Sequence, residues 1–180
     1  MYRHIIGRFN LNSGRLIVTD PCYRRSSGCN GQVENAAPGE WTGIVTVMAE
    51  GQHLYNATLE AQHESHPLQG EAANGTWEDA PFEVGVDSGQ AGIFDEATYP
   101  PGETGEWDGS GSFYDRACGA TLGAYDGSDF KRDCPAGAIT EGVVSVSGYG
   151  DGDYRCMVYR RADGVCTAVR IIFIEGGGVT

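Results

Sequence analysis

Short apolar runs separated by turn residues make up most of this chain, and several of them alternate apolar with polar positions. The segment 82–88, FEVGVDS, places Phe82, Val84 and Val86 on one face, and the segment 142–148, GVVSVSG, alternates valine with serine. A period of two is typical of β-strands that bury one face. These runs predict a protein built mainly from β-strands.

Four further segments complete the predicted strand set, and a helical period is visible in only one place. The predicted strands are GRLIVTD at 14–20, EWTGIVTVMAE at 40–50 with QHLYNATLE at 52–60 as its hairpin partner, and a C-terminal hairpin in which YRCMVYRR and CTAVRIIFI turn around Asp163 and Gly164. The helix is predicted within 113–126, and long surface loops at 61–80 and 100–112. We therefore expect one mainly-β domain over residues 1–180, either a barrel or a two-sheet sandwich, with at most one or two short helices.

The cysteines do not have the spacing of a zinc knuckle. No two of the six are separated by two to four residues, so a structural zinc site is not predicted. In the C-terminal hairpin, Cys156 and Cys166 fall on different faces or out of register, which predicts that they do not pair with each other.

Charge is distributed unevenly along the chain, whose net charge is −13. The interval between Arg25 and Arg116 contains no lysine or arginine and 16 of the 25 acidic residues, so it carries −16. The two flanks hold all 12 basic residues and 9 acidic ones, which gives +3. Such a field repels nucleic acids and favours a basic protein surface, or a small cationic or metal-bound ligand, as the partner.

Six motifs follow one another along the chain: VTDPCY (18–23), PGEW (38–41), VDSGQAGIFD (86–95), FYDRAC (113–118), SGYGDGDY (147–154) and RIIF (170–173). In this order they resemble a bacterial and phage-borne family known as domain of unknown function 4241. The resemblance implies a compact β-rich domain, and it supports treating Asp87, Asp95, Asp151 and Tyr154 as one constellation. It implies no particular activity.

The candidate site comprises Asp20, Asp87, Gln90, Asp95, Ser147, Asp151 and Tyr154. Gly89 and Gly92 between Asp87 and Asp95 allow a sharp turn that would return both carboxylates to one region. Carboxylate oxygens suit Mg²⁺ or Ca²⁺, so Asp87, Asp95 and Asp151 are the candidate metal ligands, although the spacing is not that of an EF-hand. The alternative interpretation is structural, because Asp-Gly sequences are common in tight turns.

Two other constellations are less favoured. His63 and His66 have the spacing of a metal-binding pair but lie in a polar segment beside Pro67. Cys22 could act as a nucleophile only with a histidine base nearby, and none of the four histidines lies in the motifs, which favours a buried thiol.

Two functions are compatible with this pattern. The first is an acidic, non-catalytic binding protein of the inhibitor, immunity or anti-defence type, whose partner presents a basic surface. The alternative is a metal-assisted hydrolase that acts on a small phosphorylated or nucleotide ligand through its aspartates. No secretory signal or membrane span is recognisable, so we expect a soluble cytoplasmic protein, in the cytoplasm of the host cell if a phage encodes it.

Overall fold

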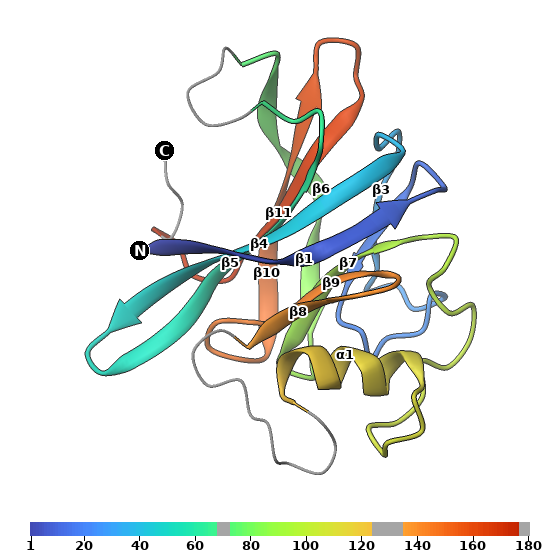
Figure 1. Ribbon diagram of the computed structural model, residues 1–180, viewed down its shortest axis with the longest axis vertical. Coiled ribbons are helices and arrows are strands. Elements are labelled where there is room, and N and C mark those ends of the chain that lie inside the picture. Colours follow the sequence, from blue (N-terminus) through green and yellow to red (C-terminus); the bar gives the residue numbers. More distant parts are fainter. Residues whose placement is uncertain (68–72, 124–134, 177–180) are drawn as a thin grey trace.

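The computed structural model describes residues 1–67, 73–123 and 135–176 (Figure 1). The strands of the first sheet are β1 (Tyr2–Leu11), β4 (Gly39–Glu50), β5 (His53–His63), β6 (Gly75–Val86), β10 (Gly152–Arg161) and β11 (Cys166–Ile172). Those of the second sheet are β2 (Leu16–Thr19), β3 (Gly31–Val33), β7 (Gln90–Asp95), β8 (Ala136–Ile139) and β9 (Gly142–Val146). The helix α1 spans Phe113–Thr121. The spatial orders are β1-β4-β5-β11-β10-β6 and β3-β2-β7-β9-β8, and the paired strands are antiparallel.

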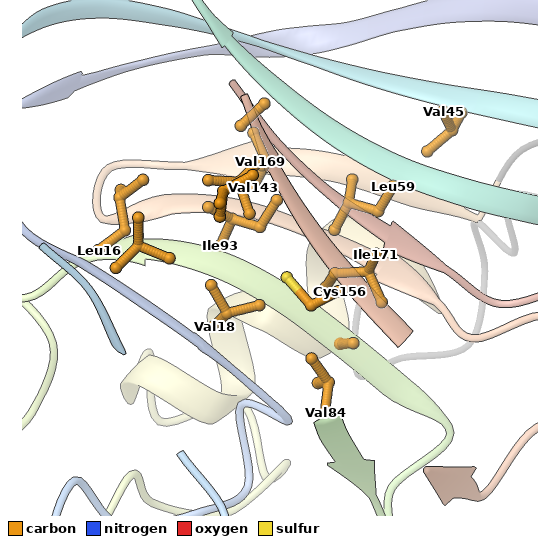
Figure 2. Close-up of a cluster of buried hydrophobic side chains, with 14 of the residues drawn as sticks. Leu16, Val18, Val45, Leu59, Val84, Ile93, Val143, Cys156, Val169 and Ile171 are labelled. Carbon is orange, nitrogen blue, oxygen red and sulfur yellow. The ribbon is translucent and has the colours of Figure 1, made fainter. Parts of the chain in front are cut away.

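The two sheets pack face to face around an aliphatic core (Figure 2). Val18 of β2 and Ile93 of β7 meet Leu59 of β5 and Val169 of β11, and all four side chains are fully buried. Burial of each such side chain stabilises the fold by about 1.5 to 3 kcal/mol. The two separate sheets make the fold a sandwich, which resolves the choice between sandwich and barrel.

Helix α1 covers the other face of the second sheet and forms a third layer, as Figure 1 shows beside β8 and β9. Phe113 and Ala117 of the helix join a second buried cluster with Phe94 and Ile17. The Ser112 hydroxyl caps the helix by accepting a hydrogen bond from an amide in its first turn. Because β7 is covered on both faces, all six of its residues are buried, and its sequence QAGIFD shows no alternation.

The predicted strands and the two predicted hairpins are present, and α1 lies within the predicted helical segment, of which residues 124–126 fall outside the described residues. The loop expected at 61–80 is wrong in part, because β5 continues to His63 and β6 begins at Gly75. The segment 100–112 contains neither helix nor strand, as expected.

The prediction that Cys156 and Cys166 do not pair with each other is confirmed. Cys156 lies opposite Ile171, whereas Cys166 lies opposite Arg160, and neither forms a disulfide. Cys134 lies outside the described residues.

The fold brings the basic flanks onto the acidic middle of the chain. Each arginine in the described ranges forms an ion pair. Glu60, which is almost fully buried, binds both Arg3 (3.3 Å) and Arg170 (2.6 Å). The other carboxylates of the interval 26–115 that are paired in this way are Glu40, Glu78, Asp79, Glu96 and Glu103. The uneven charge of the linear sequence is therefore partly neutralised in space.

Gly142 offers a direct test of the sandwich packing. A Cβ atom at Gly142 would collide with the carbonyl oxygen of Ile93 and with Cα of Phe94 (2.7 Å), and these backbone atoms cannot move without disturbing β7. We expect Gly142→Ala to lower the free energy of unfolding by about 2 kcal/mol. Gly119 in α1 has open space around it, so Gly119→Ala should raise stability by about 0.5 kcal/mol. Urea titrations of the two variants measure both effects, and equal shifts would contradict the β7–β9 packing.

Candidate functional site

Asp20 follows β2 directly and has a fully buried carboxylate. Its Oδ1 accepts hydrogen bonds from the amide of Cys22 (2.8 Å) and the hydroxyl of Ser88 (2.7 Å). Its Oδ2 accepts from the amides of Asp87 (2.9 Å) and Ser88 (2.7 Å). Four donors compensate the loss of water around this charge. Asp20 therefore fixes the turn between β6 and β7 against the end of β2.

The same turn receives contacts from two other motifs. The hydroxyl of Tyr23 donates to Asp87 Oδ2 (2.6 Å), and the amide of Gly89 donates to Asp151 Oδ1 (3.0 Å). The amide of Ser147 donates to the Gly89 carbonyl (2.9 Å). Gly89 has φ of +68°, a conformation that favours glycine. The structure thus brings Asp20, Asp87, Ser147 and Asp151 together around one turn.

The SGYGDGDY segment forms a tight turn of its own. The Gly150 amide donates to the Ser147 carbonyl, and the Ser147 hydroxyl donates to the Gly150 carbonyl, each at 2.7 Å. The Tyr154 hydroxyl lies within hydrogen-bond distance of both carbonyl oxygens. Gly148 and Gly150 have φ of +49° and +110°. The hydrogen bonds of Ser147 and Tyr154 therefore hold the turn that leads into β10.

Gln90 is buried between β7 and α1 rather than presented to a ligand. Its Oε1 accepts from the Thr121 hydroxyl (2.5 Å), and its Nε2 donates to Cys118 Sγ (3.4 Å). Only 1% of Gln90 is exposed. Its amide therefore anchors the helix to the second sheet.

Asp95 does not join the other candidate residues, so the expectation that it returns to Asp87 is wrong. The residues between them form β7 rather than a turn, and a strand rising about 3.3 Å per residue places Asp95 roughly 17 Å from Gln90. Asp95 instead accepts hydrogen bonds from the amide of Asn12 (2.9 Å) and the hydroxyl of Ser13 (2.5 Å). It closes the turn between β1 and β2 at the opposite end of the sheet.

The three carboxylates predicted to bind Mg²⁺ or Ca²⁺ therefore do not surround one point. Among the residues that the structure describes, no group of three or more His, Cys, Asp or Glu side chains is placed to hold a metal ion. Asp87 and Asp151 remain near the same turn, but each accepts a hydrogen bond there. The hydrolase hypothesis loses the geometry on which it was based.

The two histidines of the predicted pair also have other partners. The ring nitrogens of His63 face the Ser65 hydroxyl (2.8 Å) and the Pro38 carbonyl (3.0 Å). The ring of His66 packs against Tyr159, with centroids 4.6 Å apart, and burial lowers the pKa of its imidazole. These contacts support packing roles for both rings.

The electrostatics around Asp20 disfavour nucleophilic chemistry. Burial, followed by the neighbouring Asp20 carboxylate, raises the pKa of the Cys22 thiol to about 12. Burial also raises the pKa of the Tyr114 hydroxyl to about 12. The hydrogen bond to Asp87 raises the pKa of the Tyr23 hydroxyl. These groups are neutral near pH 7, and an activated thiol requires a nearby cation or base, not carboxylates.

A groove of about 720 Å³ lies where β6, β10 and the residues after β11 meet, and it is the second candidate site. Its apolar lining comes from β6, from β10 and from the end of β11 with the residue that follows. These residues are Ala80, Pro81, Phe82, Tyr154, Cys156, Ile172 and Phe173. Its charged lining consists of Asp79, Glu83, Asp153, Arg155 and Glu175. The groove combines an apolar floor with an acidic rim, which is the composition of a binding site rather than of a turn.

The rim retains most of its negative charge. Arg155 Nε binds Asp79 Oδ1 (2.5 Å), and this hydrogen bond holds the pKa of Asp79 below its usual value. Glu83, Asp153 and Glu175 are exposed and have no hydrogen-bond or ion-pair partner within the described ranges. Four carboxylates against one guanidinium leave a net charge of −3.

Sequence patterns did not reveal this groove, because its lining comes from three strand regions that are far apart in the chain. Asp153 and Tyr154 belong to the SGYGDGDY motif, but Asp153 was not among the candidate site residues. One available signal was Pro81 within an otherwise strand-like run, since proline in a strand marks an edge or a bulge.

Comparisons with known proteins add nothing to this geometry: no family model matches the chain, and neither a curated protein nor a solved structure is significantly similar to it. The resemblance to domain of unknown function 4241 stays a prediction. Within residues 1–67, 73–123 and 135–176, no helix has the length and apolar character needed to cross a membrane.

Replacing Asp20 tests the importance of the buried carboxylate. In Asp20→Asn one oxygen becomes an NH₂ group that faces backbone N–H donors, so we expect a loss of about 3 kcal/mol in the free energy of unfolding. The matched control is Asp87→Asn, which alters one exposed contact and should cost about 1 kcal/mol or less. Urea denaturation compares the two variants. Similar losses would show that Asp20 does not have this anchoring role.

Alkylation kinetics test the state of Cys22. With a pKa of about 12, roughly 1 in 10,000 of its thiols is ionised at pH 8, whereas Cys29 is exposed. We expect iodoacetamide at pH 8 to modify Cys29 at least a hundredfold faster, as followed by mass spectrometry of the proteolytic peptides. Rapid modification of Cys22 would indicate an activated thiol and would revive the nucleophile hypothesis.

Proposed function

We propose that this chain is a non-catalytic binding protein whose acidic groove accepts a basic segment of a partner protein. The observation that carries the proposal is the combination of an apolar floor with three unpaired carboxylates on one rim. A protein of the inhibitor, immunity or anti-defence type acts by occupying such a segment on its target, and it requires no catalytic group of its own.

The distribution of ion pairs supports this location over a diffuse acidic surface. Six carboxylates of the interval 26–115 already bind arginines of the same chain. In the groove, Glu83 and Asp153 have no such partner within the described residues and Glu175 has only a longer-range electrostatic interaction with Arg155, so these carboxylates can meet a cation from outside. Electrostatic complementarity of this kind guides a basic partner to one face and disfavours acidic ones.

The size of the groove is also suitable. A volume of about 720 Å³ lies within the range of pockets that bury a drug-sized ligand or a few peptide side chains. A wholly polar depression of this size would bind cations weakly, since exposed ion pairs contribute little on their own. The apolar floor supplies the remaining driving force.

Charge neutralisation on the rim tests the proposal. In the triple variant Glu83→Gln, Asp153→Asn and Glu175→Gln, we expect affinity for a short fluorescent oligolysine peptide to fall about tenfold at low salt. Fluorescence anisotropy measures the affinity, and wild-type binding should weaken with added NaCl because salt screens the exposed charges.

A second triple variant gives the matched control. Glu34→Gln, Glu64→Gln and Glu106→Gln remove the same number of exposed carboxylates away from the groove. These changes should reduce oligolysine affinity by less than about twofold. Equal losses in both triples would mean that only net charge matters, and absence of wild-type binding would overturn the proposal.

A further inference from the structure

The groove originates from a gap in the hydrogen-bonded ladder between β6 and β10. Arg155 lies opposite Glu83 and Met157 lies opposite Asp79. Between these pairs β10 has one residue, Cys156, whereas β6 has three, residues 80–82. The strands therefore separate locally in the middle of an otherwise continuous pair.

Pro81 gives the physical reason for this gap. Proline has no N–H group and cannot donate to a neighbouring strand, so it is confined to edge strands and bulges. β6 is an edge strand of the first sheet, and residues 80–82 form its bulge. The bulge leaves Phe82 against Gly31 of β3, where the two sheets meet.

The gap connects the surface with the apolar interior. Cys156 and Phe82 line the groove, although both pack with the core, and Phe173 joins them. Beside one end of the gap the strands carry the unpaired carboxylates of Glu83 and Asp153, whereas Asp79 at the other end is already paired with Arg155. An apolar cavity thus adjoins one negative position along the strand direction.

We infer that the groove recognises an extended peptide in which one apolar side chain enters the ladder gap while a neighbouring basic residue contacts the unpaired carboxylates of the rim. This inference rests on the proposed function and adds the pattern of the ligand. In an extended peptide every second side chain points to the same face. Basic and apolar residues at such alternate positions can therefore reach the rim and the floor of the groove together.

Other occupants fit less well. A linear polyamine supplies the cations but has no side chain to cover Phe82 and Phe173. A second copy of the chain carries the same net charge of −13 and would be repelled. A basic peptide with an apolar residue satisfies both the floor and the rim.

Two synthetic peptides of equal charge test the inference. The first has a central phenylalanine between lysines, and the second has serine in place of that phenylalanine. We expect the wild-type protein to bind the phenylalanine peptide at least about tenfold more tightly, because the ring is buried in the gap. Isothermal titration calorimetry measures both affinities under the same buffer conditions.

A substitution that fills the gap should remove this preference. Ala80 lines the groove and is half-buried, so in Ala80→Phe the new ring occupies the space while the rim charges remain. The two peptides should then bind with equal affinity, close to that of the serine peptide for the wild type. The control Ala162→Phe adds the same ring at the exposed β10–β11 turn and should retain the preference.

A second variant covers the case in which Ala80→Phe does not fold. Ile172→Thr keeps a β-branched residue in β11 but removes an apolar group from the groove, so the preference should fall about threefold.

The outcomes separate the two proposals. Equal wild-type affinities for both peptides would overturn the inference and leave the acidic binding function intact. A preference unchanged in both Ala80→Phe and Ile172→Thr would also overturn it, whereas failure of both peptides to bind would overturn both proposals.

Discussion

The buried carboxylate of Asp20 is the contact on which the arrangement of the two sheets depends. β6 belongs to the first sheet and β7 to the second, so the chain crosses between the sheets at residues 87–89. Asp20, at the end of β2, accepts the amides of Asp87 and Ser88 at this crossing. Without these acceptors, partly buried backbone donors would lose their partners at the point where the sheets are joined. One side chain therefore fixes the corner of the sandwich.

The groove adjoins this corner and benefits from its rigidity. Val86, the last residue of β6, pairs with Gly152, the first residue of β10, so the anchored turn leads directly into the strands that carry the rim. Asp153 lies opposite Gly85, and Glu83 lies opposite Arg155, on strands that are already ordered. Carboxylates held in this way lose little further freedom when a partner binds, which reduces the entropic cost of association.

Alternation along the sequence predicted β6, and it also predicted β9, although four of the five residues of β9 are buried; it was uninformative for β7 and β1. β7 is covered on both faces, so its residues do not alternate, and the turn inferred between Asp87 and Asp95 proved to be this strand. β1 was not predicted at all, because as an edge strand it exposes most of its N-terminal half. The ion pairs could not be predicted either, since Glu60 and its two arginines are 57 and 110 residues apart in the chain. Local sequence patterns reveal which side chains are buried, whereas the partner of a charged side chain depends on the topology of the fold.

The division of polar groups between the two candidate sites favours binding over catalysis. Around Asp20, the carboxylates of Asp20 and Asp151 accept hydrogen bonds from backbone amides and that of Asp87 accepts one from the Tyr23 hydroxyl. The neighbouring thiol and phenol groups have raised pKa values and stay neutral near pH 7. General acid–base chemistry requires groups that titrate close to the working pH, and these do not. The unpaired charges lie instead on the groove rim, above an apolar floor. The polar groups that are free to interact with another molecule are therefore the carboxylates of the groove rim, which are suited to hold a cation. The residues of the sequence motifs around Asp20 maintain the scaffold that presents these carboxylates.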